Sequence, residues 1–313
     1  FLKKREFNYQ FAISGIRMAL WGLFKKVVIA DNLAKYVAVI YSSPEDYYGI
    51  SILIATVLFT FQVYCDFSGY SDMAIGIARL FGFKLTENFR TPLFSKSMKE
   101  FWGRWHISLS TWFRDYLYIP LGGNRGNREK WAFNIFITFL VSGLWHGASW
   151  AFAIWGSLNG FYLIFARYSE SSRAKLNSMF GANNFPKAFK LFQMSLTFSL
   201  FAFSLMIFRA ESGYDALTLI KNLPQNITVQ LSSFSNFTLV FEEIFNSKLE
   251  LIYLSFSFLI FLVVDIAIRN KGIDGVIYKL PRLIRFFIYF FLILWFLMFG
   301  AFGEPQEFVY FQF

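Results

Sequence analysis

The chain has 313 residues, of which 56% are hydrophobic, 22% aromatic and only 16% charged. This composition excludes an ordinary soluble domain and is typical of an integral membrane protein. The formal net charge of +10 does not indicate nucleic-acid binding, because the cations fall in short segments between long apolar runs, as they do in membrane proteins. The apolar runs are continuous, which disfavours a β-barrel, and the single cysteine, Cys65, excludes an internal disulfide and a cysteine-based zinc cluster.

Apolar windows divide the chain into predicted membrane helices, each of which needs about 20 residues. The first region, Phe7 to Ser43, is interrupted by charges, and we expect one span plus an interfacial helix there. Six later spans are predicted at Tyr47–Tyr64, Trp131–Ser149, Trp150–Tyr168, Ala188–Phe208, Leu251–Ile268 and Phe286–Phe302. The prediction is an all-α polytopic protein with one membrane domain over residues 1–313. Because residue 1 is Phe, we expect N-terminal helices of a longer protein to be missing.

The charges between the spans predict their orientation, since cytoplasmic loops carry an excess of Lys and Arg. The basic segments 83–130, 167–190 and 269–285 are expected on the cytoplasmic side. The segments 42–46 and 211–250, together with the tail that holds Glu304 and Glu307, are expected outside.

The first of only two histidines, His106, lies in the segment RWHISLSTWFRDYLYIPLGGNRG. Helical periodicity predicts one amphipathic helix from Lys99 to Tyr118, lying along the cytoplasmic interface, with His106 near the edge of its apolar side. The tryptophans are then either an interfacial anchor, with His106 bonded to a neighbouring carbonyl, or part of a functional site.

The second histidine, His146, lies near the end of an apolar window. Asn134, Thr138, Ser142 and His146 recur every four residues and form one polar stripe on the predicted helix. A stripe of this kind in hydrocarbon requires a neighbouring helix or a water-containing cavity. An ionisable residue inside a span favours function, and the alternative is a hydrogen bond between packed helices. Gly143 and Gly147, beside the histidine, would let another backbone or a substrate come close.

The segment CDFSGYSD follows the first predicted span and contains Asp66 and Asp72. These carboxylates either line the same cavity as His146, or Asp66 or Ser68 caps a helix that carries Met73 to Phe81.

The residue types restrict the chemistry. Two histidines cannot complete a catalytic zinc site, which usually has three protein ligands. The chain has no G-x-S-x-G nucleophile elbow, no P-loop and no G-x-G-x-x-G motif. A single imidazole suffices as the general base that removes a proton from an alcohol. Transfer of an acyl group to a hydroxyl fits this set.

The segments FWGRWHISLSTWFRDYLYIPLGGNRG, YCDFSGYSDMAIG and FLVSGLWHGASW closely resemble the membrane-bound O-acyltransferase (MBOAT) family, in particular its bacterial alginate O-acetyltransferase branch. GLFKKVVIADNLA and the final FVYFQF are also similar to that branch. The resemblance implies a ring of unevenly tilted helices around a central passage. It also implies that His146 is catalytic and that His106 lies on the cytoplasmic side of the same passage.

We therefore expect a multi-pass protein of the bacterial inner membrane that acetylates an exported polysaccharide or a periplasmic partner. The donor is acetyl-CoA or another acyl thioester, with no bound cofactor and no metal. Expected partners are a periplasmic SGNH-type acetyltransferase or polysaccharide-export proteins, and the lipid bilayer, but no nucleic acid. Arg104 and Arg114 are expected to receive the anionic donor. The candidate catalytic residues are His146 and His106, and the candidate substrate-binding residues are Trp102, Arg104, Trp105, Ser110, Arg114, Asp115, Ser142, Trp145 and Asp66.

Two other classes of protein fit part of the pattern. A transporter or flippase would also use polar stripes, but it predicts an inverted repeat, which the sequence does not show. A bis-histidine haem protein would need two histidines on comparable helices, whereas His106 and His146 lie in segments of unlike character.

Overall fold

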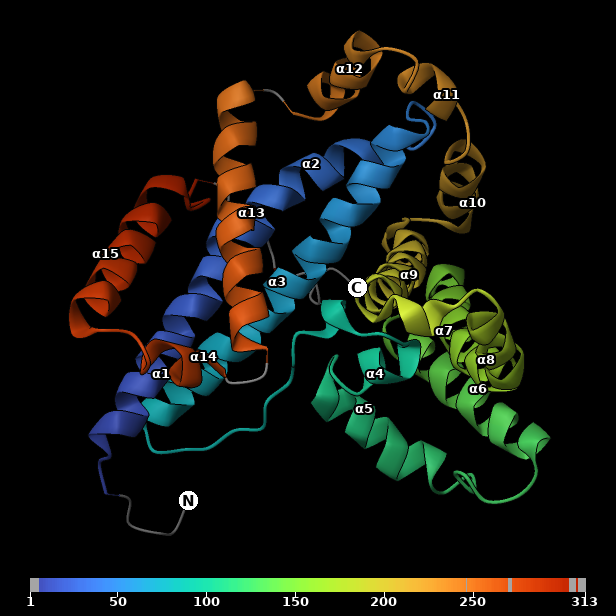
Figure 1. Cartoon of the computed structure of the whole chain (residues 1–313), viewed down its shortest axis with the longest axis horizontal. Helices are drawn as coiled ribbons and strands as arrows, with labels where there is room; N and C mark the ends of the chain where they lie inside the picture. The colour runs from blue at the N-terminus through green and yellow to red at the C-terminus, as the bar shows by residue number, and fades with distance from the viewer. Residues whose placement is uncertain (1–5, 246, 270–271, 304–307, 309–313) are drawn as a thin grey trace. The chain divides into compact units, whose positions relative to one another are not determined.

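The computed structural model describes residues 6–245, 247–269, 272–303 and 308 (Figure 1). Over these residues the chain is helical and contains no β-strand, which confirms the all-α prediction. The ring of tilted helices stays a prediction. Glu304 and Glu307, expected in the outer tail, and FVYFQF apart from Phe308 lie outside the described residues.

The described chain divides into two compact units, one within Phe1–Asn88 and Asn222–Phe313 and one over Phe89–Lys221. A single domain over residues 1–313 stays a prediction. The first unit contains α1 (Tyr9–Leu23), the π-helix η1 (Phe24–Ala30), α2 (Asp31–Tyr41), α3 (Ile50–Leu80), α11 (Ile227–Gln230), α12 (Phe234–Ile244), α13 (Lys248–Ile268), α14 (Gly272–Ile277) and α15 (Arg282–Phe299). The second contains the 3-10 helix η2 (Pro92–Phe94), α4 (Met98–Trp102), α5 (Ile107–Phe113), the π-helix η3 (Arg114–Tyr118), α6 (Arg128–Trp145), α7 (Trp150–Tyr168), α8 (Glu170–Met179), the 3-10 helix η4 (Ala182–Asn184), α9 (Pro186–Arg209) and nearly all of α10 (Gly213–Asn222).

Four helices of the described residues, α3, α9, α13 and α15, are long and apolar enough to cross a membrane by length and composition. They correspond to four of the predicted spans. The other two predicted spans are also helices, α6 and α7, and their membrane crossing stays a prediction. The chain is thus a multi-pass membrane protein with a helix at each predicted later span.

The first region, residues 7–43, forms a nearly continuous helical run of α1, η1 and α2, which packs against α3. Small residues allow α1 and α3 to approach closely. A Cβ atom added to Gly15 would lie 2.5 Å from the carbonyl oxygen of Gly76, and one added to Gly22 would lie 2.5 Å from that of Gly69. Close packing of this kind replaces the hydrophobic driving force that is absent between helices in lipid.

The acidic pair of CDFSGYSD lies within α3 and not at a helix start, so the prediction that Asp66 or Ser68 caps a helix is wrong. Lys25 and Lys26 of η1 neutralise the two carboxylates. Lys25 Nζ lies 2.7 Å from Asp72 Oδ2, and Lys26 Nζ lies 2.6 Å from Asp66 Oδ1. Because the buried charges are paired, the helix continues through a segment whose polarity suggested an end.

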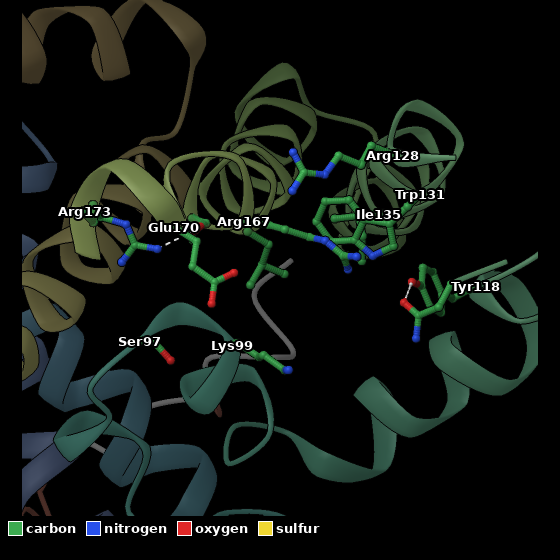
Figure 2. Close-up of a pocket in the computed structure, with 12 residues that line it drawn as sticks. Ser97, Lys99, Tyr118, Arg128, Trp131, Ile135, Arg167, Glu170 and Arg173 are labelled. Carbon is green, nitrogen blue, oxygen red and sulfur yellow. Dashed lines mark hydrogen bonds between the residues drawn. The ribbon is translucent and has the colours of Figure 1, made fainter. Parts of the chain in front are cut away.

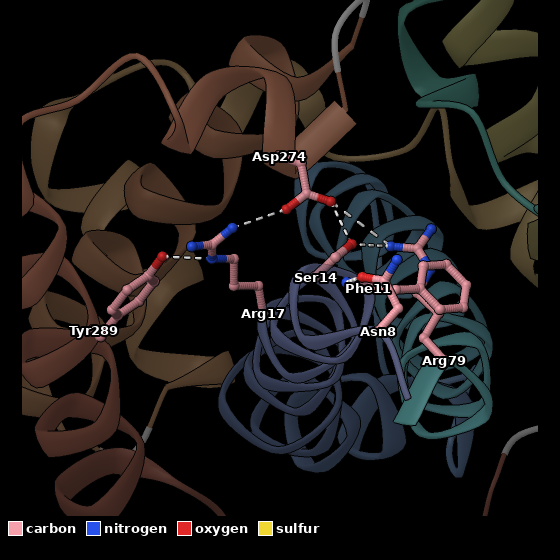
Figure 3. Close-up of polar contacts among 7 residues, drawn as sticks. All are labelled: Asn8, Phe11, Ser14, Arg17, Arg79, Asp274 and Tyr289. Carbon is pink, nitrogen blue, oxygen red and sulfur yellow. Dashed lines mark hydrogen bonds and ion pairs between the residues drawn. The ribbon is translucent and has the colours of Figure 1, made fainter. Parts of the chain in front are cut away.

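A polar network joins α1, α3, α14 and α15 within the first unit (Figure 3). Arg17 of α1 donates to Tyr289 Oη at 2.8 Å and to Asp274 Oδ1 at 3.1 Å. Arg79 of α3 donates to Ser14 Oγ at 2.6 Å, and Ser14 in turn donates to Asp274. The short helix α14 is therefore held to the long helices by its carboxylate.

The second unit is built on the antiparallel pair α6 and α7, and α9 packs on α7. Gly143 of α6 and Gly156 of α7 lie at the crossing. A Cβ atom on Gly143 would overlap the carbonyl oxygen of Phe152 and would lie 3.1 Å from the Cα of Gly156. This close approach confirms that Gly143 admits another backbone, and it draws α7 against the end of α6, where His146 lies.

We expect Gly143→Val to separate α6 from α7, at a cost of about 1–3 kcal/mol in stability, which is typical of overpacking. Thermal unfolding in detergent measures the effect. Gly213→Val is the matched control, because no atom lies within 4 Å of a Cβ built at Gly213. An equal unfolding midpoint in the two variants would contradict the close crossing.

Candidate active site

His146 occupies an aromatic box at the end of α6. It is the C-cap of that helix and is 8% exposed. The Trp155 and Phe208 rings meet the imidazole edge-on, each with its centroid 5.2 Å away, and Phe152 lies at 6.3 Å. Trp145, itself exposed, closes another side at 5.0 Å. The box, made by α6, α7 and α9, shields the imidazole from water.

Two indole N–H groups beside this box are buried without an acceptor. Among the described residues, neither Trp155 Nε1 nor Trp102 Nε1 has a hydrogen-bond partner. The two rings touch each other, with centroids 5.9 Å apart, and Trp155 also contacts His146. An unpaired buried donor costs about 1–3 kcal/mol. The site thus holds donors for which a substrate oxygen would be a suitable acceptor.

His106 does not lie on a continuous helix, so the prediction of one amphipathic helix from Lys99 to Tyr118 is wrong. The segment forms α4, α5 and η3, and His106 is the N-cap of α5 with φ 43° and ψ 55°. The break is explained by Trp105, whose ring is 4% exposed and packs on Phe101 and Phe201. This burial overrides the helical preference of the segment.

The left-handed backbone of His106 has consequences for its ring. A residue other than glycine in this region costs roughly 1–3 kcal/mol and persists only where its surroundings enforce it. The His106 carbonyl accepts the first hydrogen bond of α5, from Ser110 N at 2.9 Å. The ring is half-buried, near Phe89 and with Nδ1 3.4 Å from Ser108 Oγ. The turn therefore fixes where the imidazole lies.

The two histidines belong to the same unit and interact. Burial, and then the charge of nearby His146, lower the pKa of His106 to about 4. His106 is therefore neutral at neutral pH, with one ring nitrogen as donor and the other as acceptor.

This depressed pKa predicts a loss of stability on acidification. In the unfolded chain histidine titrates near 6.5. Above that pH both states are neutral, whereas between about 6.5 and 4 the unfolded chain binds the proton first, so stability falls as the pH falls. We expect the unfolding midpoint to drop over this range, and to drop less in His106→Gln, which does not titrate. An identical drop in both proteins would show that His106 is not held neutral.

Two tryptophans that were expected to bind substrate, Trp102 and Trp105, pack among aromatic rings of the second unit. Trp102, the last residue of α4, contacts Phe139 at 5.1 Å as well as Trp155. Trp105 is buried, and its carbonyl accepts from Ser110 Oγ at 3.2 Å. Substrate binding by Trp105 and Ser110 stays a prediction, and packing accounts for both residues.

The two arginines expected to receive the donor, Arg104 and Arg114, each form an ion pair with a carboxylate of the chain. Arg104 Nη2 lies 2.8 Å from Glu100 Oε1, in an i, i+4 ion pair. Arg114 Nε donates to its neighbour Asp115 at 2.7 Å, and this bond lowers the pKa of the Asp115 carboxyl. Their anion-binding role stays a prediction.

Two members of the polar stripe on α6, Asn134 and Thr138, form hydrogen bonds with backbone carbonyls of the protein. Asn134 Nδ2 donates to the carbonyl of Gly123 at 3.1 Å, and Thr138 Oγ1 donates to that of Asn134 at 2.7 Å. Ser142 is half-buried one turn before His146. Asp66 belongs to the first unit and the histidines to the second, so their common cavity stays a prediction.

Residues 1–207 match the sequence profile of MBOAT, the membrane-bound O-acyltransferase family. The chain belongs to this family. Both histidines lie within the matched region, and the MBOAT resemblance of the three motifs is thereby confirmed.

Several curated relatives align with the chain. It is 43% identical over 198 residues to the probable alginate O-acetylase AlgI of Pseudomonas syringae pv. tomato, covering 63% of this chain and 36% of that protein. It is 39% identical over 217 residues to the peptidoglycan O-acetyltransferase of Helicobacter pylori, covering 69% and 40%. It is 37% identical over 106 residues to the teichoic acid D-alanyltransferase of Bacillus subtilis, covering 31% and 27%. The aligned part thus spans two-fifths or less of each of these relatives.

Within this MBOAT chain, sequence reasoning missed the partners of His146 on α7 and α9. Trp155, Phe152 and Phe208 give no local signal, because each resembles an ordinary lipid-facing aromatic residue. Asn159 does give one: it is an amide inside an apolar window, it is fully buried, and its Nδ2 donates to the Trp155 carbonyl at 2.9 Å.

Proposed function

We propose that this MBOAT protein is a membrane O-acetyltransferase. It moves an acetyl group from a cytoplasmic thioester, such as acetyl-CoA, to a hydroxyl of an exported polysaccharide or of a periplasmic partner. The observation that carries the proposal is the enclosed imidazole of His146 beside two unpaired indole donors. The names of the relatives, which concern alginate, peptidoglycan and teichoic acid, support acyl transfer to a cell-surface polymer.

In the proposed reaction His146 is the general base. Its unprotonated ring nitrogen takes the proton of the acceptor hydroxyl while that oxygen attacks the thioester carbonyl carbon. The carbon–sulfur bond then breaks, the acetyl group remains on the acceptor as an ester, and the imidazolium returns the proton to the thiolate. The aromatic walls formed by Trp155 and Phe208 limit competing attack by water.

The oxygen of the thioester carbonyl becomes negative during the attack and needs donors. Trp155 Nε1 is a suitable donor, because it is buried, unpaired and carried by the ring that contacts His146. Hydrogen-bond donors that are already in position before the reaction stabilise the transition state far more in a site that excludes water than they would in water. Trp102 Nε1, on the neighbouring ring, is a second donor for the same group.

His106 is proposed to act on the donor side of the passage. Its ring is neutral, is fixed by a strained turn, and is close enough to His146 to interact electrostatically. It orients the thioester and takes no part in proton transfer. Location in the bacterial inner membrane and partnership with an SGNH-type acetyltransferase or polysaccharide-export proteins belong to this proposal.

Covalent transfer separates this function from that of a transporter or flippase. Membranes containing the protein and its polymer receive acetyl-CoA with a labelled acetyl group, and ester-linked label in the polymer is measured. We expect label that mild base releases. A flippase would move an intact acyl or glycan intermediate and would leave the polymer without label from this donor.

A further inference from the structure

A basic cavity lies within the second unit, apart from the aromatic box of His146. Its volume is about 840 Å³, and its walls come from α4, η3, α6, α7 and α8 with the turn after η3 (Figure 2). Four cations, Lys99, Arg128, Arg167 and Arg173, line it against a single carboxylate, Glu170. Within the described part of the chain none of these four cations is ion-paired with a carboxylate.

Two of the arginines, Arg128 and Arg167, are positioned by cation–π contacts. The Arg167 guanidinium lies over the Trp131 ring at 4.4 Å, and that of Arg128 lies over Tyr168 at 5.7 Å. A guanidinium stacked by its face keeps its in-plane N–H donors, which match the oxygens of a phosphate group. Arg128 is also the first residue of α6, whose N-terminus carries a partial positive charge.

Part of the cavity lining is apolar. It consists of Trp131 and Ile135 of α6 and Leu163 and Ala166 of α7. The lining therefore combines cations with apolar side chains that hydrocarbon can contact.

We propose that this cavity binds the phosphate headgroup of an anionic membrane phospholipid. The arginines hold the phosphate oxygens, and the acyl chains contact the apolar side chains of the lining. A soluble phosphate ester would use the cations but would leave the apolar part of the lining uncovered, which favours a lipid. The positive-inside pattern places this site at the cytoplasmic interface.

The test is native mass spectrometry of the full chain with phosphatidylglycerol and, separately, phosphatidylcholine. We expect Arg128→Gln and Arg167→Gln each to weaken phosphatidylglycerol binding about fivefold, with little effect on phosphatidylcholine. Glu170→Gln should strengthen phosphatidylglycerol binding severalfold, because it removes the carboxylate. All of these side chains are exposed, so the variants should fold.

Arg125→Gln is the matched control, since it removes an exposed charge from the turn between η3 and α6, outside the cavity lining. Unchanged phosphatidylglycerol affinity in Arg128→Gln and Arg167→Gln, or an equal loss in Arg125→Gln, overturns the proposal. A second experiment measures acetyl-CoA binding by the same variants, Arg128→Gln and Arg167→Gln. Loss of acetyl-CoA binding with phosphatidylglycerol binding intact would assign the cavity to a soluble phosphorylated ligand and would also overturn it. Neither experiment depends on the proposed acetyl transfer.

Discussion

Replacing His146 with Gln is expected to lower polymer acetylation by roughly 10²- to 10⁴-fold, the usual contribution of a general base. Glutamine fills a similar space at the end of α6 and keeps hydrogen-bonding capacity, but it cannot accept and return a proton at neutral pH. The aromatic box around it should therefore persist while proton transfer is lost. The measurement is acetylated polymer in membranes that contain matched amounts of each protein.

Asn134→Ala provides the control, because Asn134 is also a buried polar residue of α6. Its amide donates to the Gly123 carbonyl, so its loss should lower stability by about 1–3 kcal/mol with little effect on rate. Near-normal product from His146→Gln, or an equal loss in Asn134→Ala, would contradict the assignment of the base.

Trp155→Phe is expected to have the second-largest effect. If the indole N–H stabilises the carbonyl oxygen in the transition state, its removal should cost on the order of 10²- to 10³-fold in kcat, as for other single donors of this kind. KM should change much less, because the interaction strengthens only as charge develops. Phenylalanine retains an aromatic contact with His146 and Phe208, so the walls of the box remain.

Trp105→Phe is the matched control for this substitution. Trp105 and Trp155 are both 4% exposed and both pack among aromatic rings, but only Trp155 has its unpaired indole N–H beside His146. Both variants lose similar packing. Equal activity in Trp155→Phe and Trp105→Phe would show that the Trp155 N–H takes no part in the reaction.

Periodicity and apolar length were enough to predict the long helices, because a helix in lipid must be long and continuously apolar to satisfy its backbone. The window Trp150–Tyr168 coincides with α7. The same reasoning failed at CDFSGYSD, where Lys25 and Lys26 neutralise the acidic residues of α3 from a segment about forty positions earlier. A pairing this distant leaves no local signal.

The site was predicted in part for a similar reason. His146 could be found because an imidazole in an apolar helix needs an explanation, and the family motif agrees with it. The left-handed turn at His106 could not be predicted, because it results from the burial of Trp105 against Phe101 and Phe201. Phe201 belongs to α9, which lies about a hundred residues later in the chain. The cationic cavity was not predicted, because Lys99, Arg128 and Arg167 belong to three different helices.

The central claim is that acetyl groups pass from a cytoplasmic donor to an acceptor outside through the site of His146. Sealed membrane vesicles with the cytoplasmic face outward, loaded with acceptor polymer, test it directly when labelled acetyl-CoA is added to the medium. The account predicts ester-linked label on the enclosed polymer in wild-type vesicles and almost none in His146→Gln vesicles. Equal labelling of the enclosed polymer in both, or label only on polymer added to the medium, would contradict it.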